Sequence, residues 1–552
     1  MENSEKANKR LEHRGFTSKL LLVAAAICVV TLGSTLTASA HDPFSPIAIT
    51  ESGLVIGSTT NGVSEFLGIP YATPPVGALR WTPPKPYGFF PGFLLKATSF
   101  GSECTQAGGG SENCLFLNVY TPQNELEEDL LEDHGRGLPV MFWIHGGALT
   151  SGAGSIYDPS ELVKKGVIVV TINYRLGLLG FFAETALDTE GHDAGNYGFM
   201  DQQLALNWVR KNIAGFGGDP NRVTIFGESA GGQSVYAQLA SPTAAHLFRG
   251  AIAESGSYVE FQNYFDFIVT LAIGETTGIP FQVPAGNAIA ALFSCTTSPC
   301  LRLVPAASLV AVQAGTLYPF VDGTLLTQTI SAAFASGKFN QVPVISGTNH
   351  DEWRIFVADE YALGNALPDL PSYDAAEAAL WGALGPILLG DIETVLYPDS
   401  PANDVNGPEE LGASGTDGIF ACPARNADEL LSQFVTTYTY EFNDENAPPA
   451  QSSVPGLTFP LGAYHGSELQ YLFVLDGVPA PFTPAQEQLS EAMVTYWTQF
   501  ARNLNPNSVS QPLWSPYSTL TDEFQSLIPP TPVVEATASF ATDHKCGFWD
   551  SF

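Results

Sequence analysis

One stretch of the chain has the residue types and spacing of a nucleophilic serine site, Gly227-Glu228-Ser229-Ala230-Gly231. It fits the pattern G-x-S-x-G, in which a serine sits on a sharp turn between a strand and a helix. Residues 223–226 predict a buried strand before it, and residues 233–239 predict a helix after it. Glycines two residues either side let strand and helix approach without a Cβ clash, and the helix N-terminus favours negative charge there. Because the motif alone also fits an ordinary glycine-rich turn, a serine site also requires a histidine, an acid and oxyanion donors elsewhere in the chain.

A serine nucleophile needs a base that takes its proton and an acid that orients the base. The order serine, acid, histidine that accompanies this motif requires the histidine to come last. His465 lies late in the chain, between Tyr464 and Gly466 in a predicted loop. The other histidines lie near a chain end, in acidic or polar surroundings, or in other motifs. We therefore predict that His465 is the base; the alternative is a loop histidine that caps a helix.

Two neighbouring acidic residues are candidates for the acid. Asp351 and Glu352 follow a predicted strand that begins near residue 342. Neighbouring side chains at the end of a strand point in different directions, so only one of the two can face His465. Residue types and spacing leave both candidates open.

A second glycine turn is suited to stabilising an oxyanion. His145-Gly146-Gly147-Ala148 follows a predicted strand over residues 138–144, and two glycines there leave backbone N–H groups bare. A plain tight turn is the alternative. Strands predicted at 138–144, 167–174 and 223–226, with a helix at 199–212, describe a βαβ arrangement. Both glycine turns then fall at the carboxyl ends of strands, where ligands bind.

These elements predict an α/β protein with a large, mostly parallel central sheet flanked by helices, in a single large domain over residues 41–552. The chain has 22 Lys and Arg against 56 Asp and Glu, a net charge of −34, which disfavours nucleic acid as a partner. The acidic run 125–133 is expected to be a solvated loop. No Cys/His cluster has zinc spacing, so we expect no metal and no cofactor.

The N-terminus has the pattern of a signal peptide. Basic residues precede an apolar run over residues 20–32, and Ala38-Ser39-Ala40 supplies a cleavage site before His41. Residues 1–40 are therefore expected to be removed and the protein to be secreted or periplasmic, without stable membrane association; an uncleaved anchor is the alternative. Six cysteines remain, which allow fifteen pairings. Proximity favours Cys104–Cys114 and Cys295–Cys300, which leaves Cys422–Cys546.

The chain resembles the type-B carboxylesterases and lipases of the carboxylesterase/cholinesterase family, which have the α/β-hydrolase fold. The segments that carry the resemblance span nearly all of the chain after residue 40: Gly68–Pro84, Glu112–Val119, Trp143–Ala148, Asn173–Gly177, Gly195–Gly232, Phe248–Gly256, Gly347–Glu352 and His465–Glu468, with Cys422 and Cys546. The same three disulfide pairs fit the family pattern.

The resemblance implies a role for several residues. Glu352 matches the acid of the catalytic triad, although Trp353 stands where the family usually has glycine. The oxyanion donors are implied to be the N–H groups of Gly147, Ala148 and Ala230; a third glycine is commoner at the position of Ala148. Two further matches are Glu228, a carboxylate at the pocket floor that braces the serine turn, and Ser255, a buried serine behind the site that packing at a strand end explains equally well.

The implied activity is hydrolysis of small-molecule carboxylic esters by a Ser-His-Glu triad through an acyl-enzyme. In cholinesterases the loop between the first two cysteines is long and carries a tryptophan, and related fungal lipases use it as a lid. Here it has nine residues, Thr105–Asn113, and no aromatic side chain. We therefore expect short-to-medium acyl or bulky aryl esters. The alternatives are one dedicated natural ester (a toxin, phenolic or polymer ester), a lipase, an amidase, or a non-catalytic binding module of this fold.

Overall fold

The structure is a computed structural model that describes residues 45–123, 137–192, 195–256, 282–313, 319–362, 370–382, 386–398, 407–449, 457, 459–535 and 539–551. The compact unit is Pro46–Phe552; it is distinct from Met1–Ser45, of which only Ser45 is described. The predicted signal peptide and the acidic run 125–133 lie outside the described residues. None of the helices in the described part is long and apolar enough to cross a membrane.

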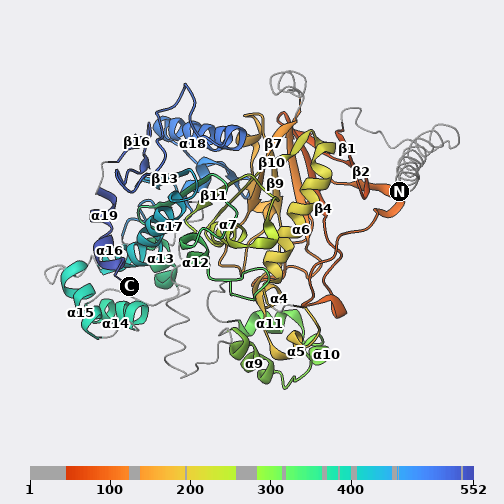
Figure 1. Ribbon diagram of the computed structural model, residues 1–552, viewed down its shortest axis with the longest axis horizontal. Helices are drawn as coiled ribbons and strands as arrows, with labels where there is room; N and C mark the ends of the chain where they lie inside the picture. Colours follow the sequence, from red (N-terminus) through yellow and green to blue (C-terminus); the bar gives the residue numbers. More distant parts are fainter. Residues whose placement is uncertain are drawn as a thin grey trace, which may run out of the picture. The chain divides into compact units, whose positions relative to one another are not determined.

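An eleven-stranded sheet forms the centre of this unit (Figure 1). Its seven strands from β15 to β9 run parallel, and the remaining strands pair antiparallel at the two edges. In spatial order the strands are β16 (Val533–Val534), β15 (Gln525–Leu527), β13 (Thr437–Phe442), β12 (Val344–Asn349), β11 (Gly250–Glu254), β10 (Gly218–Glu228), β7 (Leu138–Ile144), β9 (Ile168–Ile172), β6 (Phe116–Pro122), β4 (Val63–Pro70) and β3 (Ser58–Thr60).

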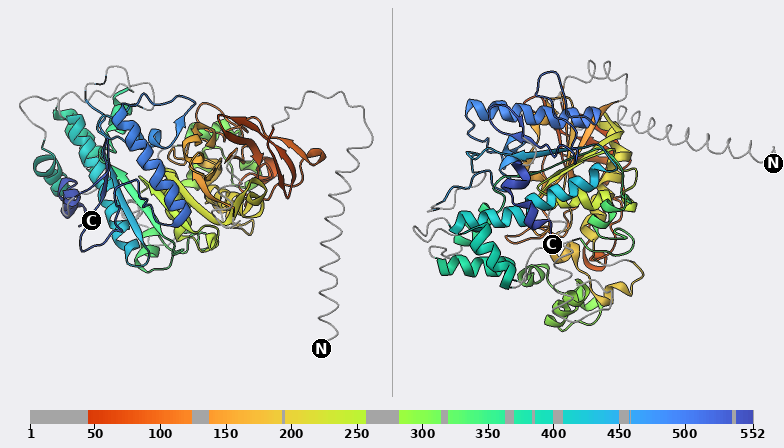
Figure 2. Two further views of the ribbon diagram at one scale, coloured as in Figure 1. Left: turned by 90° about the horizontal axis from the view of Figure 1, so that it is seen from above. Right: turned by 60° about the vertical axis from the view of Figure 1, so that its left-hand side comes forward.

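Helices cover both faces of the sheet because its central strands are apolar on both sides. All seven residues of β7 are buried. Val140 and Phe142 pack in one core with residues of α6 (Tyr197–Asn212) and α7 (Ala230–Ala240). Met141 and Trp143 point the other way and pack in a second core with α18 (Pro484–Asn503), the blue helix that lies against the sheet in Figure 2. A continuous apolar run is what a buried parallel strand requires.

The remaining elements surround this core. Two smaller sheets are not hydrogen-bonded to the large one. The first contains β1 (Ile47–Thr50), β2 (Gly53–Ile56) and β5 (Leu94–Lys96), and the second contains β8 (Tyr157–Asp158) and β14 (Val474–Leu475). The other α-helices are α3 (Ser160–Val163), α4 (Gly177–Phe181), α5 (Thr185–Asp188), α9 (Gln282–Leu292), α10 (Ser298–Leu301), α11 (Ala306–Val312), α12 (Ile330–Ala335), α13 (Arg354–Ala362), α14 (Leu370–Trp381), α15 (Pro386–Asp391), α16 (Gly407–Gly415), α17 (Cys422–Ser432), α19 (Ser539–Asp543) and α20 (Cys546–Trp549).

The predicted α/β class and mostly parallel sheet are confirmed. The predicted helix at 199–212 begins two residues earlier in α6, and the predicted strand at 223–226 is the inner part of β10. Sequence patterns marked the apolar centre of each element, whereas hydrogen bonds to neighbouring strands decide where it ends. Three disulfides join Cys104 to Cys114, Cys295 to Cys300 and Cys422 to Cys546, the pairs expected from the sequence.

Candidate active site

Ser229 occupies the sharp turn between β10 and α7 in a strained backbone conformation. Its φ is 59° and its ψ is −124°, values that a residue with a Cβ rarely adopts. Two backbone hydrogen bonds hold the turn: the N–H of Ser229 donates to the carbonyl of Glu254 (2.9 Å), and the N–H of Gln233 donates to the carbonyl of Ser229 (2.8 Å). Strain of this kind persists only where the surrounding structure fixes it, and it projects a side chain from the strand end.

The glycines beside Ser229 are required by close backbone contacts. A Cβ on Gly231 would lie 2.0 Å from the carbonyl oxygen of Ile144, and a Cβ on Gly227 would lie 2.6 Å from the same atom. Neither gap accommodates a carbon atom, so β10 and α7 approach β7 this closely only with glycine at both positions. These distances give the physical reason for the spacing seen in the sequence.

His465 and Glu352 are hydrogen-bonded to each other. The Nδ1–H of His465 donates to Oε2 of Glu352 at 2.5 Å. Glu352 is fully buried, and its other oxygen accepts hydrogen bonds from the Thr348 hydroxyl (2.8 Å) and the Asn349 N–H (2.7 Å). Three donors therefore fix this carboxylate, and the carboxylate fixes the orientation of the imidazole.

The neighbouring Asp351 faces elsewhere. Its Oδ2 accepts the N–H of Ala463 at 2.8 Å, and its Oδ1 forms an ion pair with Arg354 at 2.9 Å and a contact with His350 at 3.1 Å. The two acids that the sequence pattern left open are therefore distinguished by geometry. Only Glu352 contacts His465.

The other edge of the His465 ring faces Glu228. Nε2 lies 3.2 Å from Oε1 of Glu228, an ion-pair distance without hydrogen-bond geometry. The ring centroids of Phe356 and Phe420 lie 5.2 Å and 4.9 Å from that of His465. Within the described residues, Nε2 of His465 has no hydrogen-bond partner, so no such bond joins it to Ser229. Bonds between a nucleophile and its base are often long without substrate and shorten in the complex.

Buried carboxyl groups surround this histidine. Burial by itself lowers the pKa of His465, but the charges of Glu228 and Glu352 outweigh it and raise that pKa to about 9. Burial raises the pKa of Glu228 to about 7 and that of Glu254, its neighbour on β11, to about 8. Burial also raises the pKa of Glu468 well above its usual range. The site therefore combines one imidazole that holds a proton readily with several acids that ionise reluctantly.

The loop after β7 has the geometry of an anion-binding turn. Gly147, Ala148 and Leu149 have φ values of 101°, 53° and 59°. A Cβ on Gly147 would meet the carbonyl oxygen of Ser151 at 2.4 Å, so glycine is required there. The loop lies against the serine, because a Cβ on Gly146 would be 3.0 Å from Cβ of Ser229. Successive N–H groups in such turns form concave anion sites.

The N–H group of Ala230 is a further candidate donor, at the start of the helix that follows Ser229. Ala230 is the first residue of α7, so its N–H has no partner within the helix and carries the positive end of the helix dipole. His145, by contrast, is structural. Its ring stacks on Tyr174 at 4.4 Å, and burial lowers its pKa to about 4, so it is neutral at pH 7.

Ser255 lies behind the site at the end of β11. Its φ is 49°, and its N–H donates to the carbonyl of Gly347 at 2.8 Å. Its hydroxyl is buried and has no hydrogen-bond partner among the described residues. The backbone hydrogen bond accounts for the position of Ser255 at the strand end, and its hydroxyl takes no part in that contact.

Sequence reasoning missed several residues that shape the site. Thr348 and Asn349 hold Glu352 from the same turn, Thr348 through its hydroxyl and Asn349 through its backbone N–H. Only the hydroxyl of Thr348, four residues before the acid, was a usable signal, because any residue except proline supplies the N–H. Phe356 and Phe420, which pack on His465, come from α13 and from the π-helical turn Thr416–Ala421. No local pattern points to them, because their contact with His465 depends on the fold.

Comparisons with known proteins agree with this architecture. A model of the carboxylesterase family matches residues 45–549. The chain is 34% identical over 546 residues to cocaine esterase of Homo sapiens, and the match covers 92% of each chain. It is also 34% identical over 497 residues to para-nitrobenzyl esterase of Bacillus subtilis (strain 168), over 86% of this chain and 94% of that protein. A solved PNB esterase superposes with a TM-score of 0.69 at 32% identity, over 91% of this chain and 100% of that one. A thermophilic PNB esterase gives a TM-score of 0.70 at 30% identity, over 91% of this chain and all of that one. The chain therefore belongs to the carboxylesterase family, has the α/β-hydrolase fold, and is a serine hydrolase of small-molecule esters.

Proposed function

We propose that Ser229, His465 and Glu352 hydrolyse carboxylic esters through an acyl-enzyme. The observation that carries the proposal is the 2.5 Å hydrogen bond from His465 to the fully buried Glu352. Ser229 Oγ attacks the ester carbonyl while His465 takes its proton, and Glu352 stabilises the imidazolium. The imidazolium then protonates the leaving alcohol. Water repeats the sequence on the acyl-enzyme and releases the acid.

The negative oxygen of each tetrahedral intermediate needs donors placed before the reaction. We assign this role to the N–H groups of Gly147, Ala148 and Ala230. The support is the left-handed turn over Gly147 and Ala148, together with the position of Ala230 at the first turn of α7. Glu228 packs beneath the turn, 3.2 Å from His465, and Ser255 lies behind it. Donors aimed at a developing charge are usually the largest catalytic contribution.

The substrates we propose are short-to-medium acyl or bulky aryl esters. The loop Thr105–Asn113, the counterpart of a lipase lid, is short and is held in place. Gln106 accepts the N–H of Gly152 at 2.8 Å and donates to its carbonyl at 3.1 Å, next to the proposed oxyanion turn. The relatives' names refer to cocaine, pyrethroids and para-nitrobenzyl esters, which supports bulky esters in particular. A short loop that is hydrogen-bonded to Gly152 near its start does not serve as a mobile cover.

Hydrolysis of 4-nitrophenyl esters from acetate to palmitate tests the proposal. The purified protein is expected to act fastest on short chains, and Ser229→Ala to be inactive on all of them. A maximum at long chains that appears only above the solubility limit indicates a lipase instead. Inactivity of the folded wild type on every ester leaves a dedicated natural ester or a binding module.

We further propose that the protein is exported and that residues 1–40 are its signal peptide. The three disulfides support this, because such bonds persist in oxidising compartments. N-terminal sequencing of protein recovered outside the producing cells is expected to begin at His41. An intact N-terminus in the membrane fraction indicates an anchor.

A further inference from the structure

A second cluster of histidine and carboxylate side chains lies near the C-terminal end of the chain, and the proposed ester hydrolysis does not use it. A ring nitrogen of His350, a ring nitrogen of His544 and a carboxylate oxygen of Glu441 all lie within 4.8 Å of one another. His350 directly follows β12, Glu441 belongs to β13, and His544 directly follows α19. These residues are far apart in the sequence, so only the fold brings them together.

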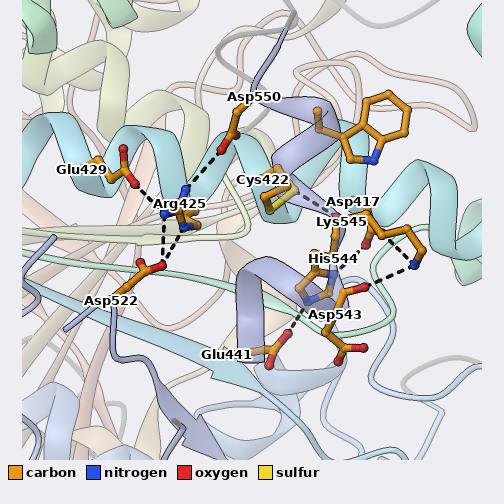
Figure 3. Close-up of a disulfide and its surroundings, with 12 residues drawn as sticks. Asp417, Cys422, Arg425, Glu429, Glu441, Asp522, Asp543, His544, Lys545 and Asp550 are labelled. Atoms are coloured by element: carbon orange, nitrogen blue, oxygen red, sulfur yellow. Dashed lines mark hydrogen bonds and ion pairs between the residues drawn. A yellow bond between two sulfur atoms is a disulfide. The ribbon is translucent and has the colours of Figure 1, made fainter. Parts of the chain in front are cut away.

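His544 has a carboxylate at each of its ring nitrogens. The residue is 3% exposed; Nδ1 lies 2.6 Å from Oδ1 of Asp417, and Nε2 lies 2.5 Å from Oε1 of Glu441. Figure 3 shows the ring between these two acids, beside the Cys422–Cys546 disulfide. An ionised carboxylate only accepts hydrogen bonds. The ring therefore either carries two protons or binds a cation in place of one of them.

His350 repeats the arrangement. Its Nδ1 lies 3.1 Å from Oδ1 of Asp351, its Nε2 lies 3.2 Å from Oδ2 of Asp543, and its ring centroid is 5.4 Å from that of His544. Each imidazole thus has one aspartate at Nδ1 and a second carboxylate at Nε2. Histidines that bind metal through one nitrogen almost always donate the other N–H to a carboxylate, carbonyl or water, which fixes the tautomer.

The two carboxylates at the Nδ1 atoms, Asp417 and Asp351, each have a cationic side chain nearby. The two at the Nε2 atoms, Glu441 and Asp543, are the inner carboxylates. Asp417 lies 3.6 Å from the ammonium of Lys545, and Asp351 forms its ion pair with Arg354 at 2.9 Å. In the described part of the chain, only histidines form ion pairs with the Glu441 and Asp543 carboxylates, although the Lys545 ammonium donates to the Asp543 carbonyl at 3.2 Å and its charge also acts on Asp543. Two neutral imidazoles and these two inner carboxylates together carry a charge of about −2, which one divalent cation balances.

We propose that this cluster binds one zinc ion through a ring nitrogen of His350, a ring nitrogen of His544 and a carboxylate oxygen of Glu441, and that the exposed carboxylate of Asp543, now beside His350 Nε2, moves in as the fourth ligand. Imidazole and carboxylate groups are zinc ligands, and four-coordinate geometry separates neighbouring ligand atoms by about 3.3 Å. The 3.2 Å contact between His350 Nε2 and Asp543 matches that spacing, whereas the 2.5 Å contact between His544 Nε2 and Glu441 is now a hydrogen bond and lengthens when the ion replaces its proton. The Asp543 side chain is 66% exposed and gives the ion a path from solvent.

The site joins the C-terminal segment to the carboxyl ends of β12 and β13. The Cys422–Cys546 disulfide attaches the same segment two residues from His544. His350 is also two residues from Glu352, so the ion rigidifies the turn that carries the proposed triad acid. Sequence patterns predict no metal here, because the ligands of this site do not have the short spacings of zinc motifs.

Zinc binding by the purified protein tests the proposal. Protein freed of metal by a chelator is titrated with Zn²⁺ in a calorimeter, and its zinc content is measured after gel filtration. We expect one tightly bound Zn²⁺ per chain, and visible absorption typical of a four-coordinate site when Co²⁺ is used instead. Asp417→Asn is expected to weaken zinc binding about 10–100-fold, and His544→Gln to weaken it further. His246→Gln, at an exposed histidine outside the cluster, is the matched control and binds as the wild type does.

A more exposed ligand separates a lost site from a misfolded protein. Asp543→Asn is expected to weaken zinc binding while thermal unfolding in chelator stays unchanged, because that side chain is 66% exposed. The proposal is overturned if the wild type takes up no stoichiometric Zn²⁺, or if Asp543→Asn and His544→Gln bind it as well as the wild type. The cluster is then a network of protonated imidazoles and carboxylates. Esterase activity is not part of the measurement, so the outcome is independent of the proposed function.

Discussion

Glu228 and Glu352 lie on opposite sides of the His465 ring. Oε2 of Glu352 accepts the Nδ1–H at 2.5 Å, and Oε1 of Glu228 lies 3.2 Å from Nε2, the nitrogen proposed to take the proton of Ser229. Both negative charges stabilise the protonated ring. Glu352 fixes the orientation of the ring, and the charge of Glu228 favours the protonated ring over the neutral one. We therefore expect the two carboxylates to set the pH at which the proposed base becomes available.

The first prediction concerns the pH dependence of kcat/KM in Glu228→Gln. Despite burial, the charges of Glu228 and Glu352 raise the pKa of His465 to about 9, and only the neutral ring acts as a base. Removing the negative charge of Glu228 lowers that pKa, so the acid limb of the profile moves to lower pH, by about one unit or more. Glu254→Gln is the control, because Glu254 bonds to Trp497 rather than to His465. An unchanged limb in Glu228→Gln excludes this electrostatic role.

The second prediction concerns the nucleophile and the oxyanion donors. Ser229→Ala removes the attacking oxygen and is expected to lower turnover by on the order of 10⁶. Gly147→Pro deletes one N–H donor and also cannot adopt the φ of 101° at this position, so it is expected to cost at least about 10². Steady-state hydrolysis of 4-nitrophenyl butyrate measures both effects, and circular dichroism checks the fold. Near-wild-type turnover by Ser229→Ala would contradict the assignment.

The third prediction separates the two neighbouring acids. Glu352→Gln leaves the His465 ring without its carboxylate and is expected to lower kcat by about 10³ to 10⁴. Asp351→Asn is expected to keep kcat within about threefold, while the lost charge partner of Arg354 costs about 1–3 kcal/mol of stability. Kinetics and urea unfolding of the two variants give the comparison. A larger fall in kcat for Asp351→Asn reverses the roles of the two acids.

The fourth prediction concerns the space around the serine turn. A Cβ on Gly231 meets the Ile144 carbonyl oxygen at 2.0 Å, so Gly231→Ala is expected to lower the free energy of unfolding by about 3 kcal/mol and to abolish activity. Gly88→Ala is the matched control, since its Cβ meets nothing within 4 Å. Urea unfolding monitored by fluorescence compares the two. Equal stability of both variants means that the turn is softer than these contacts indicate.

The fifth prediction concerns the disulfides. Cys422–Cys546 closes a sequence separation of 124 residues and Cys295–Cys300 one of 5 residues. The loop-closure entropy of the unfolded chain then predicts a stability loss of about 5 kcal/mol for the double Cys→Ser variant of the first pair and about 2 kcal/mol for the second. Equilibrium unfolding in urea measures both losses. The prediction is wrong if removing Cys295–Cys300 lowers the free energy of unfolding more than removing Cys422–Cys546 does.

The sequence by itself determined the parts of this protein that depend on local chemistry. Apolar runs predicted the central strands, because a strand buried on both faces admits few polar residues. The serine turn was recognisable because glycine is needed two residues either side of Ser229, where the backbones of β7, β10 and α7 meet. The candidate base also followed from the chain order of the motif.

Only the tertiary structure decided between groups that are equivalent in sequence. Asp351 and Glu352 are both acids at the end of β12. The contact of Asp351 with Ala463, and that of Glu352 with His465, decide which acid orients the base. The aromatic rings on His465 and the cluster of His350, Glu441 and His544 arise in the same way. Their members come from separate elements, and the sheet order that brings them together is a property of the whole chain, fixed by the packing of both faces of the sheet.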